Sequence, residues 1–206
     1  MKPIIIPQNR IQSLLDGSMT QYRFPVKPQP PTERHTLCRL IDSTDRDKTK
    51  HIGKHHWAIV DGLNISSEQG IYFNPPYKPG DKLWVREIWW KNPSYHNEYG
   101  YKADIPEIIK PTPNSSWRSP VTMPKKAARI FLKVKNVSIE KVQDISEEDA
   151  KAEGIAESET VEMADGLPCY TIPFYDLWVS TYGIDNPNAW ESNPFVWKIE
   201  FDKETK

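Results

Sequence analysis

Alternation of apolar and polar residues is the main pattern along this chain, and it predicts several β-strands. The clearest strand is Lys82–Trp90, which follows the turn-forming pair Pro79-Gly80 and combines β-branched with aromatic residues. Residues 128–142 also alternate, and the alternation slips at Lys135-Asn136, which predicts a β-bulge in a long strand. Further strands are predicted at 55–60, at 99–103 as the antiparallel partner of 82–90, and at 195–201.

Three short segments show helical spacing together with capping residues. Residues 9–16 repeat apolar residues on one face and end at Gly17. Residues 146–154 begin with a capping-box spacing at Ser146, and residues 174–182 form the third helix. Strands and helices do not follow each other in βαβ order. The pattern therefore predicts an α+β fold, in which a mostly antiparallel sheet curls into a small β-barrel with three short flanking helices.

Polar and proline-rich stretches interrupt this pattern at two places. Residues 27–54 combine several prolines with a densely charged segment, and residues 105–124 contain five prolines. Proline removes a backbone donor and fixes extended geometry, which is typical of exposed loops. With 206 residues the chain fits one domain, 1–206, with surface insertions near 27–54 and 105–124.

Charge is unevenly distributed although the formal net charge is only −1. The segment Met123–Lys135 contains five cations and no acid, whereas Asp144–Asp165 contains nine acids and one Lys. A basic strand near exposed aromatic residues suits phosphate contact combined with base stacking. A solvated face of a sheet explains the same charges, so charge alone leaves both interpretations open.

The sequence lacks the patterns that are typical of several classes of function. His51 and His55 have the i, i+4 spacing of a metal pair, but no third ligand lies nearby, and no phosphate-binding glycine loop is present. No apolar run approaches the ~20 residues that cross a bilayer, and residues 1–7 lack the pattern of a signal peptide. We therefore expect a cytoplasmic protein with no metal, no cofactor and no membrane partner.

Arg86 and Glu87 lie in the middle of a predicted strand, where adjacent side chains face opposite sides. One of the two charges therefore points inward, which is costly unless it is paired. The inward residue is a candidate either for a ligand anion or for a buried ion pair.

Six blocks of the sequence carry a family resemblance when they are taken in order and spacing. They are Leu14–Gly17 followed by Thr20 and Arg23, Pro79–Glu87, Trp117–Pro120 with Met123-Pro124, Ala128–Ile130, Gln143–Ile155 and Asn193–Trp197. Together they resemble the ASCH family, a branch of the PUA-like superfamily, and in particular its phage and prophage members. The resemblance implies a PUA-like β-barrel with a cleft where the first helix meets the barrel.

PUA-like domains typically bind RNA or modified nucleobases, so the resemblance implies RNA or a nucleoside as the partner. On this hypothesis the arginines contact phosphate or a base edge, and Trp117 or Tyr22 stacks on a base. The residues predicted to contact nucleic acid are Arg23, Arg86, Trp117, Arg118, Lys125, Lys126 and Arg129.

An alternative hypothesis comes from small ASCH proteins that remove the acetyl group of N4-acetylcytidine with a Lys, a Thr and a Glu. Matched residue by residue, the Glu is Glu153 and one Thr is Thr20, but Met19 stands at the Lys position and Tyr22 at a second Thr position. Met supplies no positive charge for an oxyanion, and a phenol with a pKa of ~10 is a poor base at neutral pH. Glu153, Thr20 and Tyr22 are the candidate catalytic residues of this amidohydrolase hypothesis, which ranks below nucleic-acid binding.

A third hypothesis is a phage-borne protein-interaction domain. The acidic stretch 144–165 either mimics nucleic acid or meets a basic partner protein on this hypothesis. A solvated helix explains the same acids equally well.

Overall fold

The computed structural model shows two compact units. The first joins Met1–Phe24 to Tyr77–Lys206, and the second is Pro25–Pro76. The predicted insertion at 27–54 therefore belongs to a longer unit, which has strands of its own. The structure describes residues 1–31, 34–39, 53–61, 64–66, 72–91, 99–104, 116–164 and 166–204.

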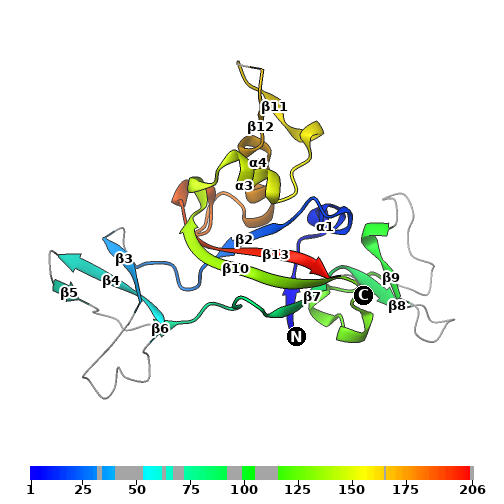
Figure 1. The fold of residues 1–206 in the computed structure, drawn as a ribbon, viewed down its shortest axis with the longest axis horizontal. Helices are drawn as coiled ribbons and strands as arrows, with labels where there is room; N and C mark the ends of the chain where they lie inside the picture. Colours follow the sequence, from blue (N-terminus) through cyan, green and yellow to red (C-terminus); the bar gives the residue numbers. More distant parts are fainter. Residues whose placement is uncertain are drawn as a thin grey trace. The chain divides into compact units, whose positions relative to one another are not determined.

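A five-stranded sheet runs through the first unit, in the strand order β1-β7-β10-β13-β2 (Figure 1). Strand β1 pairs with β7 in parallel, whereas β7 with β10 and β10 with β13 pair antiparallel. The strands are β1 (Lys2–Ile5), β2 (Gln21–Pro25), β7 (Lys82–Arg86), β10 (Phe131–Lys141) and β13 (Phe195–Glu204).

This sheet confirms the predicted α+β class with mostly antiparallel pairing. Strands β1 and β2 end the strand order, so the described strands do not form a closed barrel. The predicted strand 82–90 is divided, because β7 ends at Arg86 and β8 begins at Trp89. Two small antiparallel pairs lie outside the main sheet: β8 (Trp89–Lys91) with β9 (Tyr99–Tyr101), and β11 (Val161–Glu162) with β12 (Pro168–Cys169).

The long antiparallel pair β10–β13 contains the bulge that the sequence predicts. The register of the two strands shifts between Val134 and Asn136, where the alternation slips. A bulge inserts one extra residue on one strand and increases the local twist. Both strands curve along their length in Figure 1.

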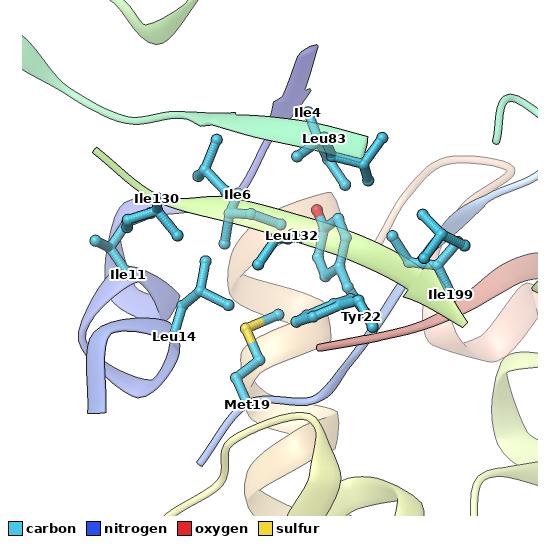
Figure 2. Packing of buried hydrophobic residues seen from close by; sticks show 13 residues of the cluster. Ile4, Ile6, Ile11, Leu14, Met19, Tyr22, Leu83, Ile130, Leu132 and Ile199 are labelled. Atoms are coloured by element: carbon cyan, nitrogen blue, oxygen red, sulfur yellow. The ribbon is translucent and has the colours of Figure 1, made fainter. Parts of the chain in front are cut away.

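The main hydrophobic core lies between this sheet and the first helix (Figure 2). Met19 is 2% exposed and its side chain lies beside Leu14 and Tyr22 within this core. Burial of a Met side chain is worth about 1.5–3 kcal/mol, so this position is used for packing. The other labelled members are Ile4, Ile6, Ile11, Leu83, Ile130, Leu132 and Ile199.

In the described part of the chain, α-helices lie at the three predicted places: α1 (Ile11–Asp16), α3 (Glu147–Ala152) and α4 (Thr171–Tyr182). Gly17 ends α1 in the left-handed conformation, with φ of +87°. Ser146 caps α3 because its Oγ accepts from the backbone N–H of Asp149 at 3.1 Å. None of the described helices is long and apolar enough to span a membrane.

Short 3₁₀ helices connect these elements. They are η1 (Gln8–Arg10), η2 (Lys102–Asp104), η3 (Pro120–Thr122), η4 (Lys125–Ala127), η5 (Val142–Asp144), η6 (Glu157–Glu159) and η7 (Trp190–Ser192).

The second unit is a small antiparallel sheet in which β4 pairs with three other strands. Strand β4 lies at the strand predicted for 55–60 and pairs antiparallel with β3, while residues 40–52 lie outside the described residues. Within this unit, Nε1 of Trp57 in β4 donates a hydrogen bond to the carbonyl of Pro28 at 2.8 Å. The strands are β3 (His35–Arg39), β4 (His55–Asp61), β5 (Asn64–Ser66) and β6 (Tyr72–Phe73).

Candidate functional site

Arg23, predicted to contact nucleic acid, lies at the centre of a buried ion-pair network in the first unit. Its guanidinium donates to Glu140 at 2.7 Å, to Asp149 at 2.6 Å and to Glu153 at 3.0 Å. The side chain of Arg23 is fully buried. Strands β2 and β10 supply Arg23 and Glu140, while α3 supplies Asp149 and ends at Glu153. This placement corrects the prediction, because the N–H groups of Arg23 already face carboxylates and not solvent.

Two further cations balance the charge of this network. Arg10 donates to Glu153 at 3.1 Å, and Lys198 donates to Asp149 at 2.6 Å. Three cations therefore face three carboxylates. Because the network is neutral as a whole, it provides no field that would attract an anionic ligand.

Burial and the ion pairs act against each other on the titration of this network. Burial raises the pKa of Glu153 above its ordinary value, although Arg10 and Arg23 act to lower it. For Arg23, burial acts to lower the pKa, but the charges of Glu153 and Glu140 outweigh it, so the pKa is raised. Arg23 thus stays charged, and Glu153 accepts from two guanidinium groups in a structural role.

The cavity next to Glu153 is too small for a nucleoside. It has a volume of about 20 Å³, and Tyr22 and Tyr182 lie on its wall. A single water needs about 10–15 Å³, so a pyrimidine ring does not fit. Burial raises the pKa of Tyr22 to about 12, and Tyr182 is its hydrogen-bond partner. A phenol that ionises so weakly does not act as a base at neutral pH.

The other positions of the amidohydrolase hypothesis also lack the required geometry. Met19 is buried in the core, and Thr20 has an exposed side chain, while its backbone N–H donates to the carbonyl of Ala152 at 2.8 Å. Among the described residues, the cations that border the cavity are Arg10 and Arg23, which are already ion-paired. The structure brings Tyr22 and Glu153 together, but it places no available cation beside them.

A larger cleft lies next to α1, near the position implied by the family resemblance. Its volume is about 460 Å³, and its charged wall residues are Arg10, Glu159 and Asp176. Glu153 neutralises Arg10, whereas neither Glu159 nor Asp176 forms an ion pair with a described residue. Two unpaired carboxylates repel phosphate, so this cleft does not suit an anionic nucleic acid.

The remaining predicted nucleic-acid residues gather in one region of the first unit, which we call the tryptophan–arginine module (residues 84–91, 99–104 and 116–131). Strand β8 pairs with β9 on one side and with Arg118 on the other, where Arg118 and Trp89 exchange backbone hydrogen bonds of 2.8 and 3.3 Å. Tyr101 donates to the carbonyl of Ala127 at 2.6 Å, which ties β9 to η4. The buried side chains beneath are Trp84, Trp89, Met123, Ala127 and Ala128.

Three arginines of this module lie over aromatic rings. Such cation–π contacts orient a guanidinium while part of it stays available to a ligand. The distances from guanidinium to ring centroid are 4.7 Å for Arg86 over Trp84, 5.2 Å for Arg118 over Trp89 and 4.0 Å for Arg129 over Tyr101.

Arg129 has a structural role within the module. Its Nε and Nη2 donate to the two carboxylate oxygens of Glu87 at 2.8 Å each, and its Nη1 donates to Asp104 at 2.7 Å. Glu87 is 1% exposed, so it is the inward residue of the Arg86-Glu87 pair. Burial raises the pKa of Glu87, although Arg129 acts to lower it. Arg129 therefore forms ion pairs with two acids of the module, and its contact with phosphate stays a prediction.

Four other cations of the module, all predicted to contact nucleic acid, remain available. Arg118, Lys125 and Lys126 are exposed, Arg86 is half-buried, and none of the four forms an ion pair with a described residue. Trp117, next to Arg118, is half-buried. Over the sequence 84–131, eight cations against four acids give a net charge of +4. This region is thus basic within a protein whose net charge is −1.

Sequence reasoning missed Arg10 and the two acids of the cleft. Arg10 and Glu153 are 143 positions apart, and no local pattern connects them. One feature of the sequence points to the acids of the cleft, since no Lys, Arg or His occurs between Lys151 and Lys198. The described residues contain no cluster of three His, Cys, Asp or Glu side chains that could hold a metal ion.

Comparison with known protein families, with characterised proteins and with solved structures gives no match. The functional assignment therefore rests on the geometry and charge of the two regions described above.

Proposed function

We propose that this protein binds single-stranded nucleic acid, in the first place RNA, through the tryptophan–arginine module. The observation that carries the proposal is the charge balance of the module: Arg129 pairs with Glu87 and Asp104, the two acids among its described residues, and the other cations exceed the one negative charge that is left. Lys125 and Lys126 of η4 are exposed and have no described ion-pair partner. Such cations gain affinity for a phosphate backbone by releasing its counterions.

Aromatic side chains in the module favour a single strand as the ligand. Unpaired bases can stack on aromatic rings and on guanidinium planes, whereas the bases of a duplex are already stacked. Trp117 is half-buried and lies directly before the exposed Arg118. The resemblance to the ASCH family supports the same class of ligand. It also favours RNA over DNA.

The proposal is tested by fluorescence anisotropy with a labelled single-stranded RNA of mixed sequence, titrated at several salt concentrations. The double variant K125Q/K126Q should lower the slope of log K against log salt by about 1.4, because each lost phosphate contact contributes about 0.7. Trp117→Ala should weaken binding by about 1–3 kcal/mol if a base stacks on this ring.

The matched control is K133Q/K135Q, which removes two exposed lysines of β10 outside the module. This variant should change the salt slope by much less than K125Q/K126Q. Equal slopes for the two double variants would show that binding is diffuse and would overturn the module as its site. Circular dichroism of each variant confirms that the fold is retained.

The amidohydrolase alternative is tested separately by incubation with N4-acetylcytidine and chromatography. We expect no release of cytidine, because Glu153 is buried and ion-paired to Arg10 and Arg23. Release that disappears in Glu153→Gln would establish hydrolysis despite this geometry.

A further inference from the structure

The segment between Lys151 and Lys198 has an unusual composition. It contains eight acids and no Lys, Arg or His. Its helix α4 and its hairpin β11–β12 therefore carry negative charge that no cation of the same segment neutralises. Figure 1 shows β11 and β12 extending away from α3 and α4.

The cleft next to α1 is built largely from this segment. Its acidic wall residues are Glu159 of η6 and Asp176 of α4, and apolar atoms come from Ile155, Pro173 and Leu177. One oxygen of Glu159 accepts from the backbone N–H of Ala156 at 2.9 Å. This bond leaves the negative charge of Glu159 uncompensated. A cleft with two carboxylates and apolar walls suits a long side chain with a cationic end.

Exposed apolar side chains continue from the cleft along the same segment. Val161, Met163 and Ile172 are 49%, 50% and 44% exposed. Ile172 directly precedes Pro173 of the cleft wall, and Val161 follows Glu159 by two positions. Exposed large apolar residues on one segment mark an interaction surface.

We propose that this cleft and the hairpin β11–β12 form a docking site for a basic, apolar segment of a partner protein. A Lys or Arg side chain of the partner enters the cleft and pairs with Glu159 and Asp176. Apolar side chains of the partner cover Val161, Met163 and Ile172. Charge complementarity selects this occupant, because nucleic acid would be repelled by the same carboxylates.

The test uses a labelled synthetic peptide in which Lys and Leu alternate, with a Glu/Leu peptide as the negative control. The protein should bind the first peptide and not the second. The double variant E159Q/D176N keeps the shape of the cleft and removes both charges, so affinity should fall by about tenfold. Met163→Ser should weaken binding by about threefold through lost apolar contact.

The matched control is D185N/E191Q, which removes two exposed acids of the same segment that do not line the cleft. It should lower affinity by less than about twofold, since charges outside the contact are screened by salt. Equal losses in the two double variants, or no binding of the Lys/Leu peptide, would overturn the proposal.

Two other occupants are distinguished by the same proteins. Sedimentation that shows a dimer in the parent chain and a monomer in E159Q/D176N would assign the cleft to a second copy and overturn the proposal. Displacement of the Lys/Leu peptide by single-stranded RNA in the K125Q/K126Q background would also overturn it. Amide shifts in NMR spectra at Leu177 and Ser180 of the cleft together with Val161, Met163 and Ile172 on peptide addition would support it.

Discussion

Strand β10 joins two regions that use charged residues in opposite ways. Its first residues pair with β7, next to the tryptophan–arginine module, where Arg129 pairs with two acids and other cations remain exposed. Its last residues lead through η5 into α3, where a neutral network buries Arg23 and the neighbouring cleft carries Glu159 and Asp176, which form no ion pair with a described residue. The charges that stay unpaired therefore differ in sign between the two ends.

The comparison teaches that the number of arginines does not decide what a region binds. A guanidinium that is buried needs carboxylate partners, since removing a charge from water costs several kcal/mol without them. Arg23 and Arg129 both satisfy this requirement within the protein. Only cations that the fold leaves unpaired can contribute to binding of an anionic ligand.

The largest expected effect concerns the buried network. Replacing Arg23 with Met should lower the free energy of unfolding by about 3–5 kcal/mol, because Glu153 then stays buried with Arg10 as its remaining cation. Urea denaturation measures this loss. The control K82M breaks the exposed pair between Lys82 and Glu204 and should cost about 0–1 kcal/mol. If R23M costs no more than K82M, Arg23 is not structural and the comparison fails.

Local patterns of the sequence predicted the elements that depend on neighbouring residues. The bulge at Val134–Asn136, the cap at Ser146 and the left-handed end of α1 at Gly17 are all confirmed. Each depends on residues within a few positions of one another. Short-range chemistry is sufficient for such features.

The partners of the charged residues could not be predicted in the same way. Arg23 and Glu153 are 130 positions apart, and Arg129 and Glu87 are 42 apart. Which of them face inward depends on how β2, β7 and β10 lie in one sheet. The sequence identified Arg23 and Arg129 as important but assigned them to a ligand, because their internal partners are visible only in the fold.

An intermediate effect is expected at the other end of β10. Arg129→Gln should lower the free energy of unfolding by about 2 kcal/mol, because Glu87 remains buried without its ion-pair partner. The salt slope of RNA binding should stay near the parent value. Arg118→Gln should instead lower the salt slope by about 0.7. Its free energy of unfolding should stay within about 0.5 kcal/mol of the parent value. A lower slope in R129Q at unchanged stability would assign Arg129 to the ligand after all.

The smallest expected effect concerns Glu147, which holds the start of α4 and hence one wall of the acidic cleft. Its carboxylate accepts from the backbone N–H groups of Tyr170 and Thr171 and from Thr171 Oγ1, the last at 2.6 Å. Burial acts to raise the pKa of Glu147, but these hydrogen bonds outweigh it and the pKa lies below the ordinary 4.5. Glu147→Gln should therefore cost about 1 kcal/mol at neutral pH.

The direction of the pKa shift of Glu147 determines how its contribution to stability changes with pH. Because the folded state has the lower pKa, ionised Glu147 stabilises the fold above the unfolded value of 4.5, and this stabilisation is lost as pH falls through the folded value. The stability gap between the parent and E147Q should shrink over the same range in urea titrations. Glu148→Gln, at an exposed position of α3, should show no such change. If the difference in free energy of unfolding between the parent and E147Q stays constant as the pH falls below 4.5, the neutral carboxyl caps α4 equally well. The negative charge of Glu147 would then not be needed to position Asp176.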